Sequence, residues 1–253
     1  MKITFLGTGT SDGVPMIGCR CKVCVSKDKR DKRTRSSVLI NHNSKNYVVD
    51  TSADFRQQML REKACSIESV FYTHAHADHS SGIVDLRSLN FIMHKPVNCY
   101  GNKYTMDNLR DKYDYFFNPV QIGGGLPQVI FHYIENEMIF DDMKVIPIPV
   151  EHGMLHILGY RFNNFTYITD ASFISKESLK LLEGTEILVL NALRYRPHYT
   201  HLSLQESVNI ADRLSVKKAY FTHMTHDVLH RHLERELPSN MYPAYDGLTI
   251  EIN

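Results

Sequence analysis

The stretch that decides the fold reads Tyr72-Thr-His-Ala-His-Ala-Asp-His-Ser-Ser-Gly82, and it directly follows the apolar residues Val70 and Phe71. In an extended loop alternate side chains point the same way, so His74 and His76 can share one metal ion. Asp78 and His79 can then turn towards a second metal ion beside the first. Imidazole and carboxylate ligands together suit Zn, Mn or Fe. The plain alternative is a polar loop that is rich in histidine.

The pattern His-x-His-x-Asp-His after a strand resembles the signature of the metallo-β-lactamase superfamily. The resemblance implies a four-layer αβ/βα sandwich with two metals between the sheets. It also implies that His74, His76 and a later His hold one metal, while Asp78, His79 and another His hold the second. An Asp would bridge the two metals. The matching candidates along the chain are His152, Asp170 and His223, each of which ends a strand-like run.

Short β-type runs alternate with helical patterns along the whole chain, which favours an α/β (α+β) class. No repeat or linker is visible, so residues 1–253 are predicted to form one domain. Strands are predicted at 2–6, 37–41, 47–50, 69–72, 97–100, 129–133, 144–150, 157–162, 165–169, 187–191, 218–221 and 248–252. Helices are predicted at 54–62, 83–89, 102–111, 176–182, 204–214 and 228–236. Ser203 and Glu206 form a capping-box pattern at one helix start.

The composition is that of an ordinary soluble globular protein, with 43% hydrophobic and 23% charged residues and a formal charge of +1. That balance gives no general attraction to nucleic acid or to an anionic membrane. The basic run Lys27–Arg35 is interpreted as a solvated loop. No apolar run approaches the length of a membrane span, and the cysteines do not resemble a secreted disulfide framework. A cytoplasmic location is therefore expected.

A second cluster, Gly18-Cys19-Arg-Cys21-Lys-Val-Cys24, places three thiols in a short loop. Thiolates favour zinc, and a closed tetrahedral site needs a fourth ligand. A redox-active or simply reduced cysteine cluster is the alternative. A disulfide between Cys21 and Cys24 would leave Cys19 unpaired.

The opening Phe5-Leu-Gly-Thr-Gly-Thr-Ser-Asp-Gly-Val-Pro15, followed by this cysteine pattern, is similar to the PhnP branch of the superfamily. Members of that branch are cyclic phosphodiesterases with an extra structural zinc. The resemblance implies that His226, three residues after His223, is the fourth ligand of the cysteine site. It also matches His201 to a histidine that acts as general acid or phosphate contact, with His198 as the local competitor.

The predicted function is therefore a dinuclear metal hydrolase of small phosphodiesters, such as cyclic ribose phosphates or cyclic nucleotides. A metal-bridging hydroxide would attack phosphorus, with Asp78 and His201 as the catalytic residues and Mn, Zn or Fe as the metals. Asp50 is predicted to accept a proton from a metal-bound histidine; its alternative role is to cap the next turn. Arg194 and Arg196 could pair with phosphate oxygens.

A tRNA 3′-processing endonuclease is the main competing function, but the near-neutral charge disfavours a nucleic-acid substrate. The fold would also allow thioester or β-lactam hydrolysis, a redox di-iron centre or a non-catalytic metal-binding protein. No membrane partner is expected. The aromatic segment Gly101–Pro127, with the glycines 123–125, is interpreted as a lid or a homodimer contact. An ordinary helix packed on the core is the competing interpretation.

Overall fold

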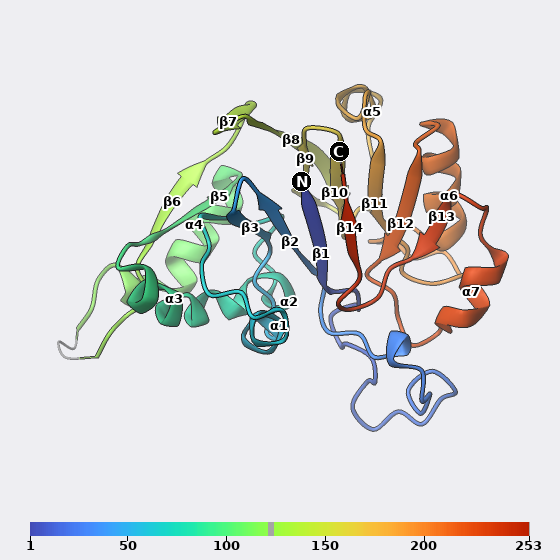
Figure 1. Cartoon of the computed structure of the whole chain (residues 1–253), viewed down its shortest axis with the longest axis horizontal. Helices are drawn as coiled ribbons and strands as arrows, with labels where there is room; N and C mark the ends of the chain where they lie inside the picture. Colours follow the sequence, from blue (N-terminus) through green and yellow to red (C-terminus); the bar gives the residue numbers. More distant parts are fainter. Residues whose placement is uncertain (121–123, 253) are drawn as a thin grey trace.

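Two sheets of seven strands each form the centre of the computed structural model, which describes residues 1–120 and 124–252 (Figure 1). The strands are β1 (Lys2–Gly7), β2 (Ser37–His42), β3 (Lys45–Val49), β4 (Ser69–Phe71), β5 (Val97–Gly101), β6 (Val129–Tyr133), β7 (Met138–Phe140), β8 (Met143–His152), β9 (Leu155–Phe162), β10 (Phe165–Ile168), β11 (Ile187–Asn191), β12 (Lys218–Thr222), β13 (Met241–Pro243) and β14 (Thr249–Glu251). One sheet has the order β14-β1-β2-β3-β4-β5-β6 and the other β13-β12-β11-β10-β9-β8-β7. The strands from β3 to β6, and those from β10 to β13, are parallel.

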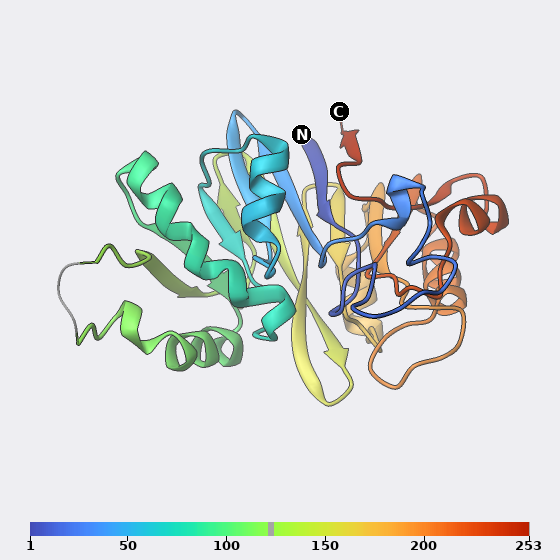
Figure 2. The ribbon, with the colours of Figure 1, turned by 90° about the horizontal axis from the view of Figure 1, so that it is seen from below.

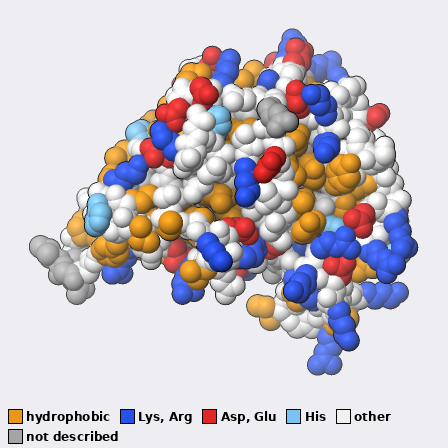
Figure 3. Space-filling model, viewed as in Figure 1, with side chains coloured by type: hydrophobic (Ala, Val, Ile, Leu, Met, Phe, Trp, Pro, Cys, Tyr) orange, Lys and Arg blue, Asp and Glu red, His pale blue; other side chains and the backbone are white. Residues whose placement is uncertain are grey.

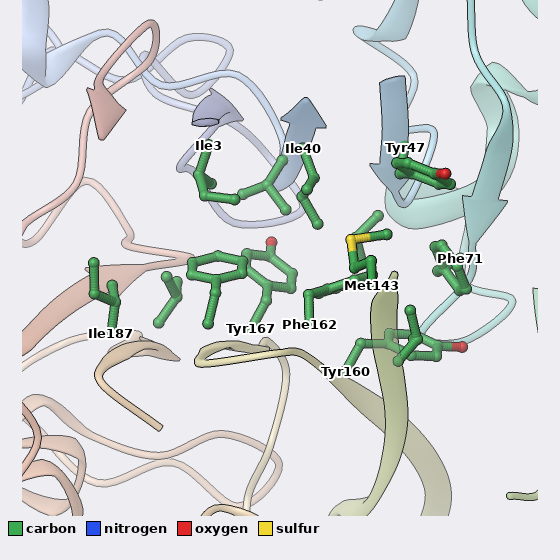
Figure 4. Packing of buried hydrophobic residues seen from close by; sticks show 14 of the residues in the cluster. Ile3, Ile40, Tyr47, Phe71, Met143, Tyr160, Phe162, Tyr167 and Ile187 are labelled. Carbon is green, nitrogen blue, oxygen red and sulfur yellow. The ribbon is translucent and has the colours of Figure 1, made fainter. Parts of the chain in front are cut away.

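Side chains of the inner strands alternate between two cores, as the two-residue period of a strand requires. In β2, Val38 and Ile40 enter the core between the sheets, whereas Leu39 faces the helices. Phe162 and Tyr167 enter the same inter-sheet core from the other sheet (Figure 4). Burial of this apolar surface is the dominant favourable contribution to folding.

The helices cover the two outer faces and complete the predicted four-layer αβ/βα sandwich. They are α1 (Phe55–Glu62), α2 (Ala77–Ser80), α3 (Leu86–Met93), α4 (Lys103–Lys112), α5 (Lys176–Leu181), α6 (Leu204–Arg213) and α7 (His230–Glu236), with short 3-10 turns η1 (Lys29–Asp31), η2 (Ser81–Asp85) and η3 (Asp114–Phe116). Helices α1, α3 and α4 pack on the first sheet, and α5 to α7 pack on the second. No helix within the described ranges is long and apolar enough to span a membrane.

The sequence-based predictions locate most elements but miss the strands β7 and β13 and the four-residue helix α2. Strands β7 and β13 have three residues each and lie at sheet edges, where a two-residue alternation is too short to recognise. The helix predicted at 83–89 begins at Leu86, because residues 81–85 form the 3-10 turn η2. The capping box at the start of α6 is confirmed, since Ser203 and Glu206 each bond the other's backbone N–H.

The N-terminal loop, residues 8–36, lies at the same edge of the sandwich as α2, as Figures 1 and 2 show. Lys and Arg side chains gather on its protruding part (Figure 3). The interpretation of Lys27–Arg35 as a solvated loop is only partly right, because Asp31 and Arg33 are buried. The Arg33 guanidinium lies 3.4 Å from Asp31 and donates to Val228 O at 2.9 Å.

The aromatic segment after β5 contains both buried and exposed side chains. Helix α4 and Tyr113 pack on the core of the first sheet, as the ordinary-helix interpretation expects. The side chain of Tyr104 remains exposed, on the face of α4 nearest the histidine motif. Gly123, in the predicted glycine run, lies outside the described residues.

Candidate metal centres

The histidine motif follows β4 and combines an extended segment with a short helix. His76 has extended dihedral angles and caps α2, so only the first half of the motif is the extended loop predicted from the sequence. Helix α2 carries Asp78 and His79. The last residue of the motif, Gly82, has to be a glycine, because a Cβ at this position would collide with the carbonyl oxygen of Ser52. The local chain therefore presents two pairs of ligands in two different conformations.

The first ligand group contains His74, His76 and His152, whose candidate ligand atoms all lie within 4.8 Å of one another. His152 is the last residue of β8, and its Nδ1 lies 2.8 Å from Thr200 O, to which it donates. That hydrogen bond leaves Nε2 as the unprotonated nitrogen of the neutral imidazole. Burial lowers the pKa values of His74 and His152, which keeps both rings in the neutral form that binds metals.

The second group contains Asp78, His79, Asp170 and His223, again within 4.8 Å. His79 Nε2 lies 3.4 Å from Asp78 and 3.3 Å from Asp170, and His223 Nδ1 lies 3.2 Å from Asp170. His79 Nε2 is buried without a hydrogen-bond partner in the described chain. A buried polar nitrogen that faces two carboxylates fits a divalent metal ligand, so the residues present suit the metal that the prediction requires.

Asp170 connects the two groups. It also clusters with His152 and His201, and its Oδ2 lies 3.1 Å from His201 Nε2. Burial by itself would raise the pKa of Asp170, but the imidazoles of His223 and His79 hold that pKa well below its usual range. Asp170 is therefore ionised and placed where the predicted bridging ligand is needed.

Asp50 lies directly behind the second group. It is fully buried, its Oδ2 is 2.7 Å from His79 Nδ1, and it accepts from the backbone and hydroxyl of Thr73 at 2.8 Å each. This contact orients the His79 ring so that Nε2 faces the ligand cluster. The structure thus places Asp50 directly behind His79, and its predicted role behind a metal ligand stays a prediction.

Three of these residues adopt left-handed backbone conformations. The φ angles are 62° at Asp50, 59° at Asp170 and 57° at His223. Asp and His tolerate this region better than most residues, but backbone strain of this kind tends to gather at functional sites. All three lie just after strands that pair in parallel with a neighbour, β3, β10 and β12.

His201 lies beside both ligand groups, with ring contacts to His152 and His223. Its ring stacks on that of His223, with centroids 5.0 Å apart. Thr200 Oγ1 lies 2.8 Å from His201 Nδ1 and 3.2 Å from His198 Nδ1. The same threonine thus holds His152 through its carbonyl and His201 through its hydroxyl. Sequence reasoning missed Thr200, because only the folded loop reveals both contacts.

The predicted phosphate contacts Arg194 and Arg196 are not brought to the ligand groups. Arg194 donates to the carbonyls of Arg196 and Pro197 in its own loop. Arg196 is mostly exposed and lies 3.7 Å from Asp227. These contacts do not hold either guanidinium group next to the candidate metal ligands.

The cysteine loop forms a separate group. Cys19, Cys21, Cys24 and His226 lie within 4.8 Å of one another, and Cys19 Sγ and Cys21 Sγ are each 3.3 Å from His226 Nδ1. All five cysteines of the chain are free thiols, so the disulfide alternative is not seen. The backbone N–H of Cys24 lowers the pKa of Cys21 to about 6. A sulfur-rich, four-ligand group of this kind suits zinc.

The cysteine group connects the N-terminal loop to the segment that carries His223. Met224 N donates to Thr8 O at 3.0 Å. Ser36 Oγ lies 3.2 Å from His223 Nδ1. Arg33, which no sequence signal singled out, adds a buried tether to the same segment. His226 and the chain around it therefore fix the position of a candidate active-site ligand.

Known proteins resemble the chain over its whole length. A family model described as a beta-lactamase superfamily domain matches residues 45–224. The crystal structure of a diphosphatase from the PhnP family is 41% identical, covers 100% of this chain and 98% of that chain, and has a TM-score of 0.93. Zn²⁺-bound PqqB from Methylobacterium extorquens, 17% identical with a TM-score of 0.82 and full coverage of both chains, shares the fold. An octanoyltransferase of Porphyromonas gingivalis is 35% identical over all of this chain, which spans 52% of that protein.

Proposed function

The chain belongs to the metallo-β-lactamase superfamily and to its PhnP family, and on that premise we propose that it hydrolyses small phosphodiesters or diphosphates with two divalent metals. The observation that carries the proposal is the position of Asp170, which belongs to the second ligand group and also clusters with His152 of the first group and with His201. Two metals on such groups lower the pKa of a bound water and neutralise charge on phosphate oxygens.

The protein's own residues would position the metal ions and supply a proton to the leaving group. His74, His76 and His152 would hold one metal ion; Asp78, His79 and His223 would hold the other, and Asp170 both. His201 would carry a proton at Nε2 towards the leaving oxygen, while Thr200 fixes the opposite side of its ring. A general acid that is oriented in this way typically contributes about 10²–10⁴-fold to a rate.

The proposal gives a different role to each metal-binding group. Zinc in the Cys19, Cys21, Cys24 and His226 group would be structural, because four protein ligands leave no open position for a substrate. Octanoyl transfer is not proposed, since this chain matches only about half of that relative.

A hydrolysis panel with Mn- and Zn-loaded protein tests the proposed function. It compares cyclic ribose phosphates, 2′,3′-cyclic nucleotides, a nucleoside diphosphate ester, pre-tRNA, a thioester and a β-lactam, with Asp170→Asn as the inactive reference. Turnover of small phosphodiesters or diphosphates above that reference is expected. Turnover of pre-tRNA alone would instead support the endonuclease alternative, and turnover of the thioester alone would support acyl chemistry.

A further inference from the structure

The hydroxyl of Thr73 lies between the carboxylate of Asp50 and the ring of His74. Thr73 directly precedes the first ligand candidate of the histidine motif and is fully buried. Its Oγ1 donates to Asp50 Oδ2 at 2.8 Å and lies 2.9 Å from His74 Nδ1. The hydroxyl therefore connects a carboxylate that lies behind the second ligand group to a histidine of the first.

The direction of these two hydrogen bonds follows from the chemistry of the partners. A hydroxyl has a single proton to donate, whereas a carboxylate accepts. Asp50 takes the proton of the Thr73 hydroxyl, so the lone pairs of that oxygen face His74. His74 must then donate from Nδ1, which leaves its Nε2 without a proton.

This unprotonated nitrogen is the one that the first ligand group needs. His74 Nε2 lies 3.0 Å from His76 Nδ1, inside the group that also contains His152. Two ring nitrogens can bind the same metal only when neither of them carries a proton. A proton on His74 Nε2 would therefore block the first position, and the contact with Thr73 keeps that proton on Nδ1.

His79, in the second group, has an acceptor that cannot reverse, because its Nδ1 lies 2.7 Å from the same Asp50 Oδ2. A hydroxyl could either donate to His74 Nδ1 or accept from it. Asp50 removes this ambiguity by accepting the hydroxyl proton. One carboxylate oxygen thus orients His79 directly and His74 through Thr73.

Backbone contacts hold Thr73 in place from both sheets. Thr73 N donates to Asp50 Oδ1 at 2.8 Å, and Thr73 O accepts from Leu158 N of β9 at 3.1 Å. The preceding carbonyl, of Tyr72, accepts from the Tyr160 hydroxyl of the same strand at 2.7 Å. A substitution that removes only the hydroxyl keeps these contacts, so the effect of the hydroxyl can be isolated.

We propose that Thr73 is a positioning residue whose hydroxyl transmits the orienting effect of Asp50 to His74, so that one buried carboxylate sets a ligand of each metal position. The inference rests on the two-metal site of the proposed function. Loss of the hydroxyl should weaken the first position and leave the second intact.

Metal affinity measured at each position separately tests this asymmetry. In an Asp78→Ala background, which keeps the first position, Thr73→Val should lower the affinity for Mn²⁺ by about 10–100-fold. In a His152→Ala background, which keeps the second, Thr73→Val should leave the affinity unchanged. Free Mn²⁺ is followed by its electron paramagnetic resonance signal. Equal losses in the two backgrounds, or no loss in the first, would overturn the proposal.

Three further variants make the test specific. Thr73→Ser keeps a hydroxyl and should bind Mn²⁺ as the wild type does. Thr166→Val, the matched control, removes a fully buried hydroxyl that lies 2.7 Å from the Thr185 hydroxyl, and it should change neither affinity. Thr73→Ala tests the same asymmetry if thermal unfolding shows that the valine variant does not fold.

Asp50→Asn tests the other half of the path. It should weaken the first position as well as the second. Combined with Thr73→Val, it should weaken the first position by less than the sum of the two single losses of binding free energy, because both changes act on one chain of hydrogen bonds. Fully additive losses would show that the two residues act independently, which contradicts the proposal.

The tautomer of His74 is a readout that needs neither metal nor substrate. Long-range proton–nitrogen NMR spectra of the metal-free protein should show the Nδ1–H form in the wild type and the Nε2–H form in Thr73→Val. His152, whose Nδ1 donates to Thr200 O, should keep the Nδ1–H form in both. An unchanged His74 tautomer would overturn the role of Thr73. If the wild type hydrolyses no phosphodiester or diphosphate, the proposed function fails, while the tautomer and the Mn²⁺ affinities still decide this inference.

Discussion

The two candidate metal sites of this chain, the cysteine group and the combined histidine and aspartate groups, are built in opposite ways. Three of the four ligands in the cysteine group come from one loop, Cys19–Cys24, and only Cys24 among the four is buried. The seven ligands of the other group extend from His74 to His223, and most are buried at strand ends. The cysteine group would enclose an ion with protein ligands alone, whereas Asp170 of the second ligand group also contacts His152 of the first group and His201.

From this difference we expect one site to stabilise the fold and the other to perform chemistry. A closed tetrahedral site contributes folding free energy, whereas a catalytic site keeps a position open for water or substrate. Substitutions in the two groups should therefore change different measurements.

The largest effect is expected for Asp170→Asn. Loss of the shared carboxylate should reduce phosphodiester turnover by about 10³-fold or more, while zinc in the cysteine group stays bound. Metal analysis together with kinetics measures both. Asp212→Asn, on the exposed side of α6, is the control. Retention of full activity by Asp170→Asn would remove the proposed basis of catalysis.

Cys21→Ser should have the opposite profile. We expect loss of one zinc per chain and a decrease in the free energy of unfolding of about 2–5 kcal/mol. Activity should then fall as a consequence, because His226 no longer fixes the segment that carries His223. Metal content and thermal unfolding are the measurements, with the exposed Cys65→Ser as control. An unchanged zinc content would show that this group is not a metal site.

Asp50→Asn should weaken metal binding or activity by about 10–100-fold. The neutral amide has one acceptor oxygen, whereas both carboxylate oxygens of Asp50 accept hydrogen bonds, from Thr73 and from His79. Titration of the metal-free protein with Mn measures the effect, and the exposed Asp142→Asn is the control. If Asp50 acted only as a turn cap, stability would fall while metal affinity stayed the same.

The smallest effect is expected for Thr200→Val, which removes the hydroxyl next to His201 but keeps the carbonyl next to His152. The value of kcat should fall by about 3–10-fold with KM and metal content unchanged, and Thr200→Ser should restore it. A parallel rise in KM would indicate that Thr200 acts on substrate binding instead.

The candidate ligands could be predicted because each follows an apolar run or belongs to a dense motif. Asp170 and His223 come directly after recognisable strands. The family resemblance then indicated which residues would share a metal ion. Thr200 and Arg33 could not be predicted, because their roles depend on contacts between segments far apart in the sequence. Helix α2 was missed because four residues are too few for a helical period to be recognised.

The left-handed backbone at Asp50, Asp170 and His223 sets the mutational tolerance of the centre. At each position the fold itself disfavours β-branched replacements, since Val or Ile cannot adopt these φ angles without strain. Asn and Gly can adopt them, so Asp→Asn variants retain the chain path while losing the charge. A saturation library scored separately for abundance and for activity should therefore show Val and Ile depleted from the folded pool at these three positions. At His74 and His152, which lie outside the left-handed region, both scores should depend on the side chain alone.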